Sequence, residues 1–338
     1  MTTHANRPPT LKTVAELTGL SQSTVSLCLR GGSSVKASTR EKVERVAREV
    51  GYVPNRAGVR LRTGKTNVLA LVLAADKNYV DFTRQLIQGI GAEIEGSPFH
   101  LNVIPEFNRS EPTAVVRYIL ETRSADGVIL THTSARDPRV QLLMDAGLPF
   151  VCHGRTEFYA PHPFADFDAA GFVDVAVKRL AERGRKRLLL AAPDNGTTHY
   201  ATLLNSFRRA VADCGLIGET AADPSAMNSA SEARKYAETL TDLEPGYDGI
   251  ITNIELIALA LAGGLRDAGL KLGQDYDLIC KQNTELVPAL FPRMEAVRED
   301  LLTTGRELAA LLIRRLAGEP AEALQSLQAP DPTWRATP

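Results

Sequence analysis

Residues 10–30 read TLKTVAELTGLSQSTVSLCLR, and this stretch predicts two short helices joined by a tight turn. The apolar face of the first helix is formed by Leu11, Val14 and Ala15. Gly19 ends that helix, and Ser21 is placed to cap the next one. The apolar face of the second helix is formed by Val25, Cys28 and Leu29. Two helices with this turn between them predict a helix-turn-helix.

A third helix follows, and the capping box Ser38-x-x-Glu41 predicts its start. Apolar residues recur behind it at helical spacing, at Val43, Val46, Ala47 and Val50, before Gly51 supplies a stop. This helix would cover the open side of the helix-turn-helix. The sequence therefore predicts an all-α domain over residues 1–52.

Charge is distributed unevenly along the 338 residues, although the formal net charge is only -1. Residues 1–65 hold 12 Lys and Arg against 4 Glu, a net charge of +8, and the rest of the chain carries -9. A basic head on an acidic body predicts that the head binds a polyanion and the body does not.

Side chains near the start of the second helix suit DNA. If its apolar face points inward, the side chains that point outward are those of Gln22, Ser23, Ser26 and Leu27. Short polar groups there suit base edges, and the helix N-terminus with Ser21 and Thr24 suits phosphate. The alternative is a generic three-helix bundle whose serines only cap the helix and contact water. The net charge and the tight turn favour DNA.

Residues 10–73 resemble the LacI/GalR family of bacterial transcription regulators. The segments that carry the resemblance are Val14-Ala15, Gly19-Leu20-Ser21, Thr24-Val25-Ser26, Thr39-Arg40, Gly51-Tyr52-Val53-Pro54-Asn55 and Leu61-Arg62-Thr63-Gly64. The resemblance implies that residues 53–65 form a hinge helix and linker that fold on operator DNA, with Leu61 inserted into the minor groove. An apolar wedge between base steps kinks DNA and exposes more contact surface.

The expected DNA contacts come from the whole head and from the hinge. They are Leu11, Ser21, Gln22, Ser23, Thr24, Ser26, Leu27, Arg30, Val35, Thr39, Tyr52, Asn55, Arg56 and Leu61. Leu27 stands where the family usually has a basic residue that reads guanine, so the preferred operator should differ. Gly58 stands where the hinge usually has alanine, and glycine costs a helix about 1 kcal/mol relative to alanine.

From Val68 onward, short apolar runs alternate with amphipathic stretches. Strands are expected at 68–73, 100–104, 128–130, 150–152, 187–191, 249–251 and 278–280. Helical patterns lie between them, for example at 82–95, 172–183, 203–214 and 256–268. This alternation predicts an α/β body with doubly wound parallel sheets, and about 270 residues are too many for one such sheet. We expect two lobes over residues 66–330 and a loose tail over 331–338.

The body resembles the LacI/GalR effector domain, which shares its fold with periplasmic sugar-binding proteins. The resemblance rests on residues 125–129, 147–151, 167–168, 247–250 and 267–270. It implies that the chain crosses between the lobes near 166–168 and returns near 297–301, and that the second domain binds effector and mediates dimerisation.

Polar residues that follow the predicted strands are candidates for the effector pocket, since ligands bind at the C-terminal strand ends of such sheets. The candidates are Asp76, Phe82, Thr131, His153, Arg155, Thr198, His199, Tyr200, Asn253, Glu255, Lys281 and Gln282, with His132 beside them. Planar polar groups bind paired hydroxyls, and Phe82 or Tyr200 would supply a face for a sugar ring. The family pattern weakens here, at Leu203, at Ile254-Glu255 and at 280–283, so the ligand or its pose should differ.

Several classes of protein are disfavoured. The four cysteines, Cys28, Cys152, Cys214 and Cys280, are scattered without metal-ligand spacing, and we expect neither metal nor cofactor. The first ten residues are no signal peptide, and no apolar run approaches the ~18 residues of a membrane span. Gly89-Ile90-Gly91 begins a dinucleotide fingerprint but lacks its third glycine.

We therefore expect a cytoplasmic, homodimeric repressor that a mono- or disaccharide releases from a pseudo-palindromic operator of double-stranded DNA. A regulator that needs a co-repressor, or an activator, is the alternative. A solute-binding protein would need a signal peptide and no basic head. An enzyme would use His132, His153 and His199 as acids and bases, but no nucleophile elbow or nucleotide loop accompanies them.

Overall fold

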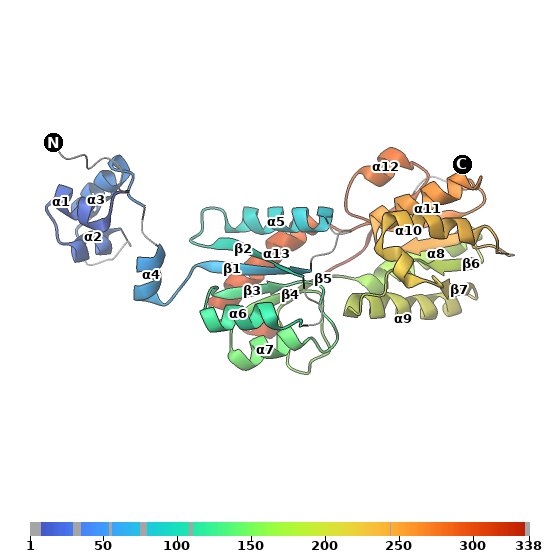
Figure 1. Ribbon diagram of the computed structural model, residues 1–338, viewed down its shortest axis with the longest axis horizontal. Helices are drawn as coiled ribbons and strands as arrows, with labels where there is room; N and C mark the ends of the chain where they lie inside the picture. The colour runs from blue at the N-terminus through green and yellow to red at the C-terminus, as the bar shows by residue number, and fades with distance from the viewer. Residues whose placement is uncertain are drawn as a thin grey trace. The chain divides into compact units, whose positions relative to one another are not determined.

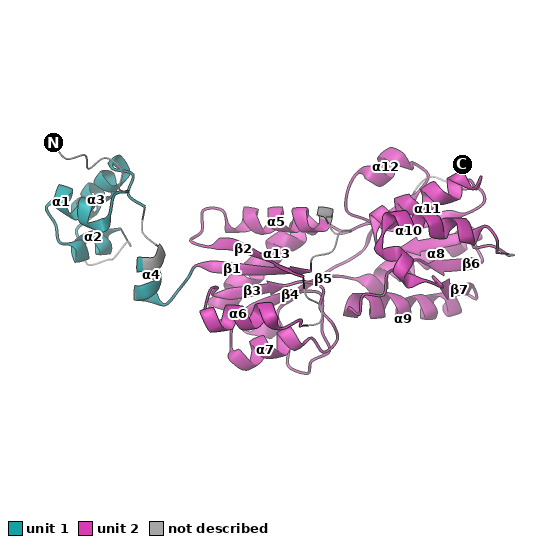
Figure 2. Cartoon of the chain, viewed as in Figure 1, with its two compact units in different colours: residues 1–66 teal, residues 67–338 magenta. Residues whose placement is uncertain are grey.

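A computed structural model describes residues 8–29, 35–53, 56–74, 80–107, 111–243 and 245–334. The chain divides into two compact units, residues 1–66 and residues 67–338 (Figure 2). Three of the predicted site residues, Arg30, Asn55 and Asp76, lie outside the described residues, as does the side chain of Arg56. Within the described ranges, no helix is both long and apolar enough to cross a membrane.

The first unit is helical (Figure 1). Its elements are α1 (Leu11–Thr18), α2 (Gln22–Cys28), α3 (Ala37–Glu49) and α4 (Arg56–Thr63). The buried core of α1–α3, the head core, comprises Val14, Ala15, Val25, Cys28, Val43 and Ala47. Gly19, at φ 72°, ends α1, and the Ser21 side chain accepts a hydrogen bond from the Thr24 N–H at 3.1 Å. The predicted helix-turn-helix is therefore present.

The start of α3 differs from its prediction. The helix begins at Ala37, and no side chain caps it, so the expected capping box of Ser38 and Glu41 is wrong. Ser38 already lies inside the first turn of α3, so its side chain does not occupy the N-cap position. The Lys36 carbonyl instead accepts hydrogen bonds from the N–H groups of Thr39 and Arg40. A capping box does occur in the head, between Thr10 and Thr13 at the start of α1.

The second unit is an α/β body, and its described residues form two six-stranded sheets. We call the parts built on them the first and the second lobe. The first sheet has the order β11-β5-β4-β3-β1-β2, and its strands are β1 (Val68–Ala74), β2 (His100–Glu106), β3 (Gly127–Leu130), β4 (Phe150–His153), β5 (Phe164–Phe167) and β11 (Gln325–Gln328). All pairs in it are parallel.

The second sheet has the order β12-β10-β9-β8-β6-β7. Its strands are β6 (Arg187–Leu190), β7 (Ile217–Thr220), β8 (Gly249–Thr252), β9 (Asp277–Gln282), β10 (Glu295–Arg298) and β12 (Asp331–Thr333). Its pairs are parallel except that of β10 with β12. The predicted fold, a helical head with two doubly wound parallel sheets, is confirmed. The prediction from sequence lacked β5, β7, β10, β11 and β12.

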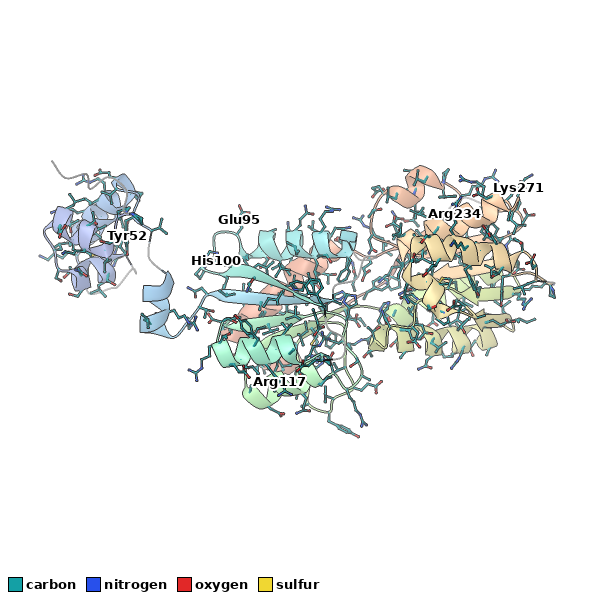
Figure 3. All side chains as sticks on the ribbon, in the orientation of Figure 1. Tyr52, Glu95, His100, Arg117, Arg234 and Lys271 are labelled. Carbon is teal, nitrogen blue, oxygen red and sulfur yellow. The ribbon has the colours of Figure 1, made fainter. Side chains whose placement is uncertain are left out.

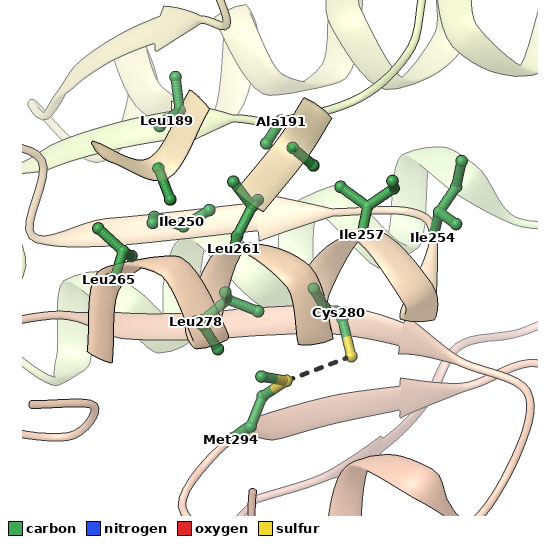
Figure 4. Packing of buried hydrophobic residues seen from close by; sticks show 14 of the residues in the cluster. Leu189, Ala191, Ile250, Ile254, Ile257, Leu261, Leu265, Leu278, Cys280 and Met294 are labelled. Carbon is green, nitrogen blue, oxygen red and sulfur yellow. Dashed lines mark hydrogen bonds between the residues drawn. The ribbon is translucent and has the colours of Figure 1, made fainter. Parts of the chain in front are cut away.

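Helices cover both faces of each sheet (Figure 1). In the first lobe, α5 (Val80–Ile94) and α13 (Leu301–Leu316) pack on one face, and α6 (Ala114–Thr122) and α7 (Pro138–Ala146) on the other. In the second lobe, α8 (Ala169–Glu182) and α9 (Thr198–Asp213) lie opposite α10 (Ala230–Leu240) and α11 (Glu255–Asp267). The second lobe also contains the short helices η2 (Pro224–Asn228) and α12 (Leu286–Leu290), and η3 (Ala321–Ala323) precedes β11 in the first lobe. Figure 4 shows Leu261 and Leu265 of α11 against Ile250 and Leu278 of the second sheet.

The chain passes between the lobes three times. It leaves the first sheet after Phe167 and enters the second lobe at α8, then returns between Arg298 and Leu301. A third crossing, which the sequence did not indicate, joins β11 to β12. The expected loose tail over 331–338 is therefore wrong for its first part. Asp331–Thr333 pair with β10, and Trp334 packs against the core of the second lobe with the Arg179 guanidinium 5.6 Å from its ring centre.

Candidate functional site

The N-terminus of α2 presents a polar surface on the first unit. Gln22 and Ser23 are exposed, and Thr24 and Leu27 are half-buried. The Ser21 hydroxyl lies 2.7 Å from that of Ser23 and 2.8 Å from that of Thr24, so the three form one hydrogen-bonded group. Such a group at a helix N-terminus suits a phosphate or a base edge.

Other predicted DNA contacts lie at the edge of the head core. Leu11, Val35 and Tyr52, the last labelled in Figure 3, are half-buried and pack against the head core, and Thr39 is half-buried on α3. Ser26 was expected to point outward, but only 9% of its surface is exposed. On the helical wheel it lies beside Leu29, at the edge of the buried face, and the outward expectation for it is wrong.

The helix α4 carries the predicted hinge residues. Leu61 exposes 90% of its surface, which is unusual for a leucine on a helix of eight residues. A methyl group added at Gly58 would meet nothing within 4 Å. The glycine therefore serves no close packing within the described chain.

A cavity in the second unit lies between the two lobes. Most of its lining residues come from the C-terminal ends of strands or directly follow them, as expected for a doubly wound sheet. They are Phe82, His132, Thr133, His153, Gly154, Asp166, Asn195, Thr197, His199, Asn253, Lys281 and Glu299. We call this the interlobe cavity. One wall is aromatic, because the Phe82 ring centre lies 5.5 Å from that of His132 and 5.1 Å from that of His153.

A buried ion pair forms another wall. Lys281 Nζ lies 2.6 Å from Glu299 Oε2, and Asn283 Nδ2 donates to the same oxygen at 3.0 Å. Burial alone would raise the pKa of Glu299, but Lys281, with smaller effects from His153 and His199, lowers this pKa to about 2. Across the cavity, Arg155 Nε donates to Asp166 Oδ2 at 2.8 Å. Each charge that borders the cavity therefore has an opposite charge beside it.

Two histidines of the cavity, His153 and His199, are neutral at pH 7. Burial, with Lys281 close by, lowers the pKa of His199 to about 3, and burial also lowers the pKa of His153. The Nε2 atoms of both rings are buried without a hydrogen-bond partner among the described residues, and so is Asn253 Oδ1. Buried polar atoms are normally hydrogen-bonded, so three such atoms in one cavity indicate a polar ligand.

Five predicted pocket residues line the interlobe cavity: Phe82, His153, His199, Asn253 and Lys281. His132 does so as well. Arg155 is not a lining residue, but it donates a hydrogen bond to Asp166, which lines the cavity. Tyr200 is half-buried against the core of the second lobe, and the Thr198 N–H donates across the lobes to the Thr133 carbonyl at 3.0 Å.

The side chains of three predicted pocket residues bond to the protein itself and do not line the interlobe cavity. Thr131 is fully buried, and its hydroxyl donates to the Val72 carbonyl at 3.1 Å. The Glu255 carboxylate accepts hydrogen bonds from the Asn283 and Thr284 N–H groups at 3.1 and 2.9 Å, which fixes the loop after β9. Gln282 donates to the Thr284 carbonyl in that loop. None of these three side chains lines the interlobe cavity, because each is held by hydrogen bonds to nearby backbone groups.

The sequence prediction lacked six lining residues, Thr133, Gly154, Asp166, Asn195, Thr197 and Glu299. Two of them carried a usable signal. Asp166 lies in β5 directly before the first crossing between the lobes and Glu299 lies on the second, and a crossing segment must border the cleft that it spans. Among the residues that the structure describes, no group of three or more His, Cys, Asp or Glu side chains is placed to hold a metal ion.

Comparison with known proteins identifies both units. Residues 10–55 match the bacterial regulatory proteins of the lacI family, and residues 177–337 match the periplasmic binding protein-like domain. The transcriptional regulator CelR of Thermobifida fusca is 30% identical over 322 residues, which cover 94% of each chain. The regulator AglR of Rhizobium meliloti is 32% identical over 319 residues, covering 90% of this chain and 87% of that one.

A solved structure of a CelR–cellobiose complex is also similar. It shares 26% identity with a TM-score of 0.70, and the match covers 98% of this chain and 100% of that one. The similarity therefore extends through the helical head, the crossings and both lobes. This chain is a member of the lacI family of bacterial regulatory proteins, and it regulates transcription by binding DNA through its helix-turn-helix.

Proposed function

We propose that this protein is a repressor of sugar or glycoside utilisation genes, which an uncharged sugar-like effector in the interlobe cavity releases from its operator. The three buried polar atoms without partners, on His153, His199 and Asn253, carry this proposal. They would bond to hydroxyl groups, and Phe82 would pack against the C–H face of a ring. The similar structure that holds cellobiose supports a sugar as the ligand class.

The crossings between the lobes supply a route from ligand to DNA. Glu299 belongs both to the cavity wall and to the crossing that leads into α13, and α13 packs against α5 in the first lobe. A ligand that hydrogen-bonds to Lys281 or Glu299 therefore acts on a segment that must change when the lobes open or close. The first lobe begins at β1, only four residues after α4, so lobe movement would reach the hinge.

We propose a homodimer that binds a pseudo-palindromic operator in the cytoplasm. One head offers few base contacts, and two-fold symmetry doubles them at a fixed spacing. Leu61 would enter the minor groove. The remaining predicted DNA contacts, including Gln22, Ser23 and Leu27, stay proposals for the same interface.

We further propose that the cavity histidines bind ligand and do not catalyse. The relatives carry the names of transcriptional regulators, and the neutral imidazoles of His153 and His199 have free positions for ligand hydroxyls. A co-repressor would bind in the same cavity but would strengthen operator binding instead of weakening it, and an activator would use the same cavity as well. In either case the linkage between the ligand site and the DNA site is reciprocal.

Two measurements on the full chain test this function. In a thermal-shift screen of mono- and disaccharides, at least one sugar should raise the melting temperature of the protein. Replacing Asn253 with Ala should remove that shift, because the amide would no longer bond to the ligand. Replacing exposed Ser231, on α10 and outside the cavity, with Ala should leave it unchanged. Equal shifts in all three proteins would contradict the proposed site.

A further inference from the structure

A second cavity adjoins the interlobe cavity. His132, Asn195 and Thr197 line both cavities, so the two share a wall that combines the first lobe with the second. The second cavity extends from this wall toward Glu106, Ser134 and Arg139. The ligand site described above therefore continues beyond the part that one ring against Phe82 would occupy.

A rigid polar wall is built around Arg139, which is only 4% exposed. Its Nε and Nη2 donate to the Asp137 carboxylate at 3.0 and 2.7 Å, and its Nη1 donates to Glu106 Oε2 at 2.9 Å. Its Nη2 also donates to the carbonyls of Thr131 and His132, both at 3.1 Å. The second hydrogen of Nη1 has no acceptor among the described residues, so one donor of a fixed guanidinium remains for a ligand.

The same network positions the residue at the junction of the cavities. His132 has φ 56°, in the left-handed region that non-glycine residues rarely adopt, and Arg139 holds its carbonyl. The Thr198 N–H donates to the neighbouring Thr133 carbonyl and joins the two lobes at this point. The junction is therefore fixed from both lobes, with the His132 ring packed against Phe82.

Charge restricts what this continuous site accepts. In the interlobe cavity, Lys281 is balanced by Glu299, and Arg155 by Asp166. In the second cavity, one guanidinium faces the two carboxylates of Asp137 and Glu106. Burial would raise the pKa of Asp137, but Arg139 lowers it, so the carboxylate stays charged at neutral pH. An excess negative charge repels phosphate and carboxylate groups and favours hydroxyls.

We propose that the second cavity is a second subsite for the same effector, which is therefore an uncharged sugar of at least two rings, one against Phe82 and the next over Arg139. This inference rests on the proposed function, since it specifies which sugars the interlobe cavity binds. The second ring would accept the free Arg139 hydrogen and donate hydroxyl hydrogens to the carboxylates beside it.

Calorimetric titration of the full chain tests the subsite with glucose, galactose, glucose 6-phosphate, cellobiose, maltose and melibiose. At least one disaccharide should bind about tenfold or more tightly than either hexose, because the second ring adds hydrogen bonds to the protein. Glucose 6-phosphate should bind no more tightly than glucose. A hexose that binds as tightly as every disaccharide, or a tighter phosphate ester, would overturn the proposal.

A variant that fills only the second cavity separates the two subsites. Ser134→Trp should reduce the disaccharide affinity to that of the hexose and leave hexose binding unchanged. Ser134→Ala removes the hydroxyl without filling the space and should keep the preference for the disaccharide. Equal losses for hexose and disaccharide in the tryptophan variant would overturn the second subsite. Binding of none of these sugars by the natural protein would contradict the sugar effector itself, and the subsite with it.

Discussion

Leu61 is the residue whose exposure is hardest to explain within a single chain. It exposes 90% of its surface on α4, where burial of a leucine side chain would stabilise the protein by about 2 kcal/mol. We expect Leu61→Ala to weaken operator binding by roughly tenfold or more, because the minor-groove wedge would be lost. Sugar binding should be unchanged. Fluorescence anisotropy with a labelled operator and calorimetry with the sugar measure the two effects.

Leu290→Ala is the matched control for Leu61, since Leu290 is also exposed but lies on α12 of the second lobe. It should leave operator affinity unchanged. If the two alanine variants bind the operator equally well, Leu61 is no wedge.

His199 predicts a pH dependence of stability. Its pKa is about 3 in the folded protein, against an ordinary value of 6.5, so the unfolded chain takes up a proton first as the pH falls. Stability is therefore lost from about pH 6.5 downward, by roughly 1 kcal/mol at pH 5.5 for one such group. His153 and His162 act in the same direction, because burial lowers the pKa of each.

Urea unfolding without ligand, between pH 7.5 and 5, measures this dependence. His199→Gln should reduce the loss of stability on acidification, since glutamine does not titrate. His100, labelled in Figure 3, is exposed on β2 and provides the control variant His100→Gln. An unchanged pH slope in the His199 variant would contradict the assignment of this histidine as buried and neutral.

For single residues, the position in the sequence predicts a place in the binding site only where it also determines the direction of the side chain. Asn253 follows the central strand β8, Lys281 lies near the end of β9, and both line the interlobe cavity. Thr131 and Glu255 also follow strands, but one bonds inward to a neighbouring strand and the other binds a loop. That choice depends on hydrogen-bond partners far away in sequence, which no local pattern contains.

At the scale of elements, Gly58 makes α4 a poor helix in isolation. Gly58→Ala should stabilise the helix by about 1 kcal/mol and tighten operator binding roughly fivefold for each hinge. The added methyl group would meet nothing within 4 Å, so no steric cost arises in the described chain. Anisotropy against the natural protein gives the change. Weaker binding would show that DNA or a second chain approaches Gly58 closely.

The crossing of α5 and α13 depends on Gly89. A methyl group there would overlap the carbonyl oxygen of Leu302 and lie 2.9 Å from Gly305 Cα. Gly89→Ala should therefore reduce the free energy of unfolding by about 1–3 kcal/mol. Gly91 lies two residues further along α5 with open space around its Cα, so Gly91→Ala should be neutral or stabilising. Equal urea midpoints for both variants would contradict the close packing.

Gly89 also illustrates why elements were easier to predict than their packing. The pair of glycines in Gly89-Ile90-Gly91 indicated only an incomplete nucleotide motif, whereas the structure uses the first glycine for contact between helices. The central strands β1, β3 and β8 were predicted because each contains an unbroken run of apolar residues. Edge strands such as β7 and β12 are largely exposed and become strands only by pairing with a neighbour.

At the scale of the whole molecule, the chain combines a basic helix-turn-helix with a ligand cavity bordered by the crossings between two lobes. Glu299 lies on such a crossing, Asp166 lies in β5 directly before another, and both line the cavity. A ligand that binds there changes the equilibrium between lobe arrangements only by its difference in affinity for them. A difference of about 1–3 kcal/mol suffices to change operator affinity about 5–150-fold.

The most direct test is an operator titration with and without a sugar that the screen shows to bind. The natural protein should bind a labelled inverted repeat far more tightly than a half-site of equal length, and the sugar should weaken binding to the inverted repeat about 5–150-fold. Operator affinity that stays the same with several sugars verified to bind, or that rises with them, would contradict the proposed release of the repressor by its effector.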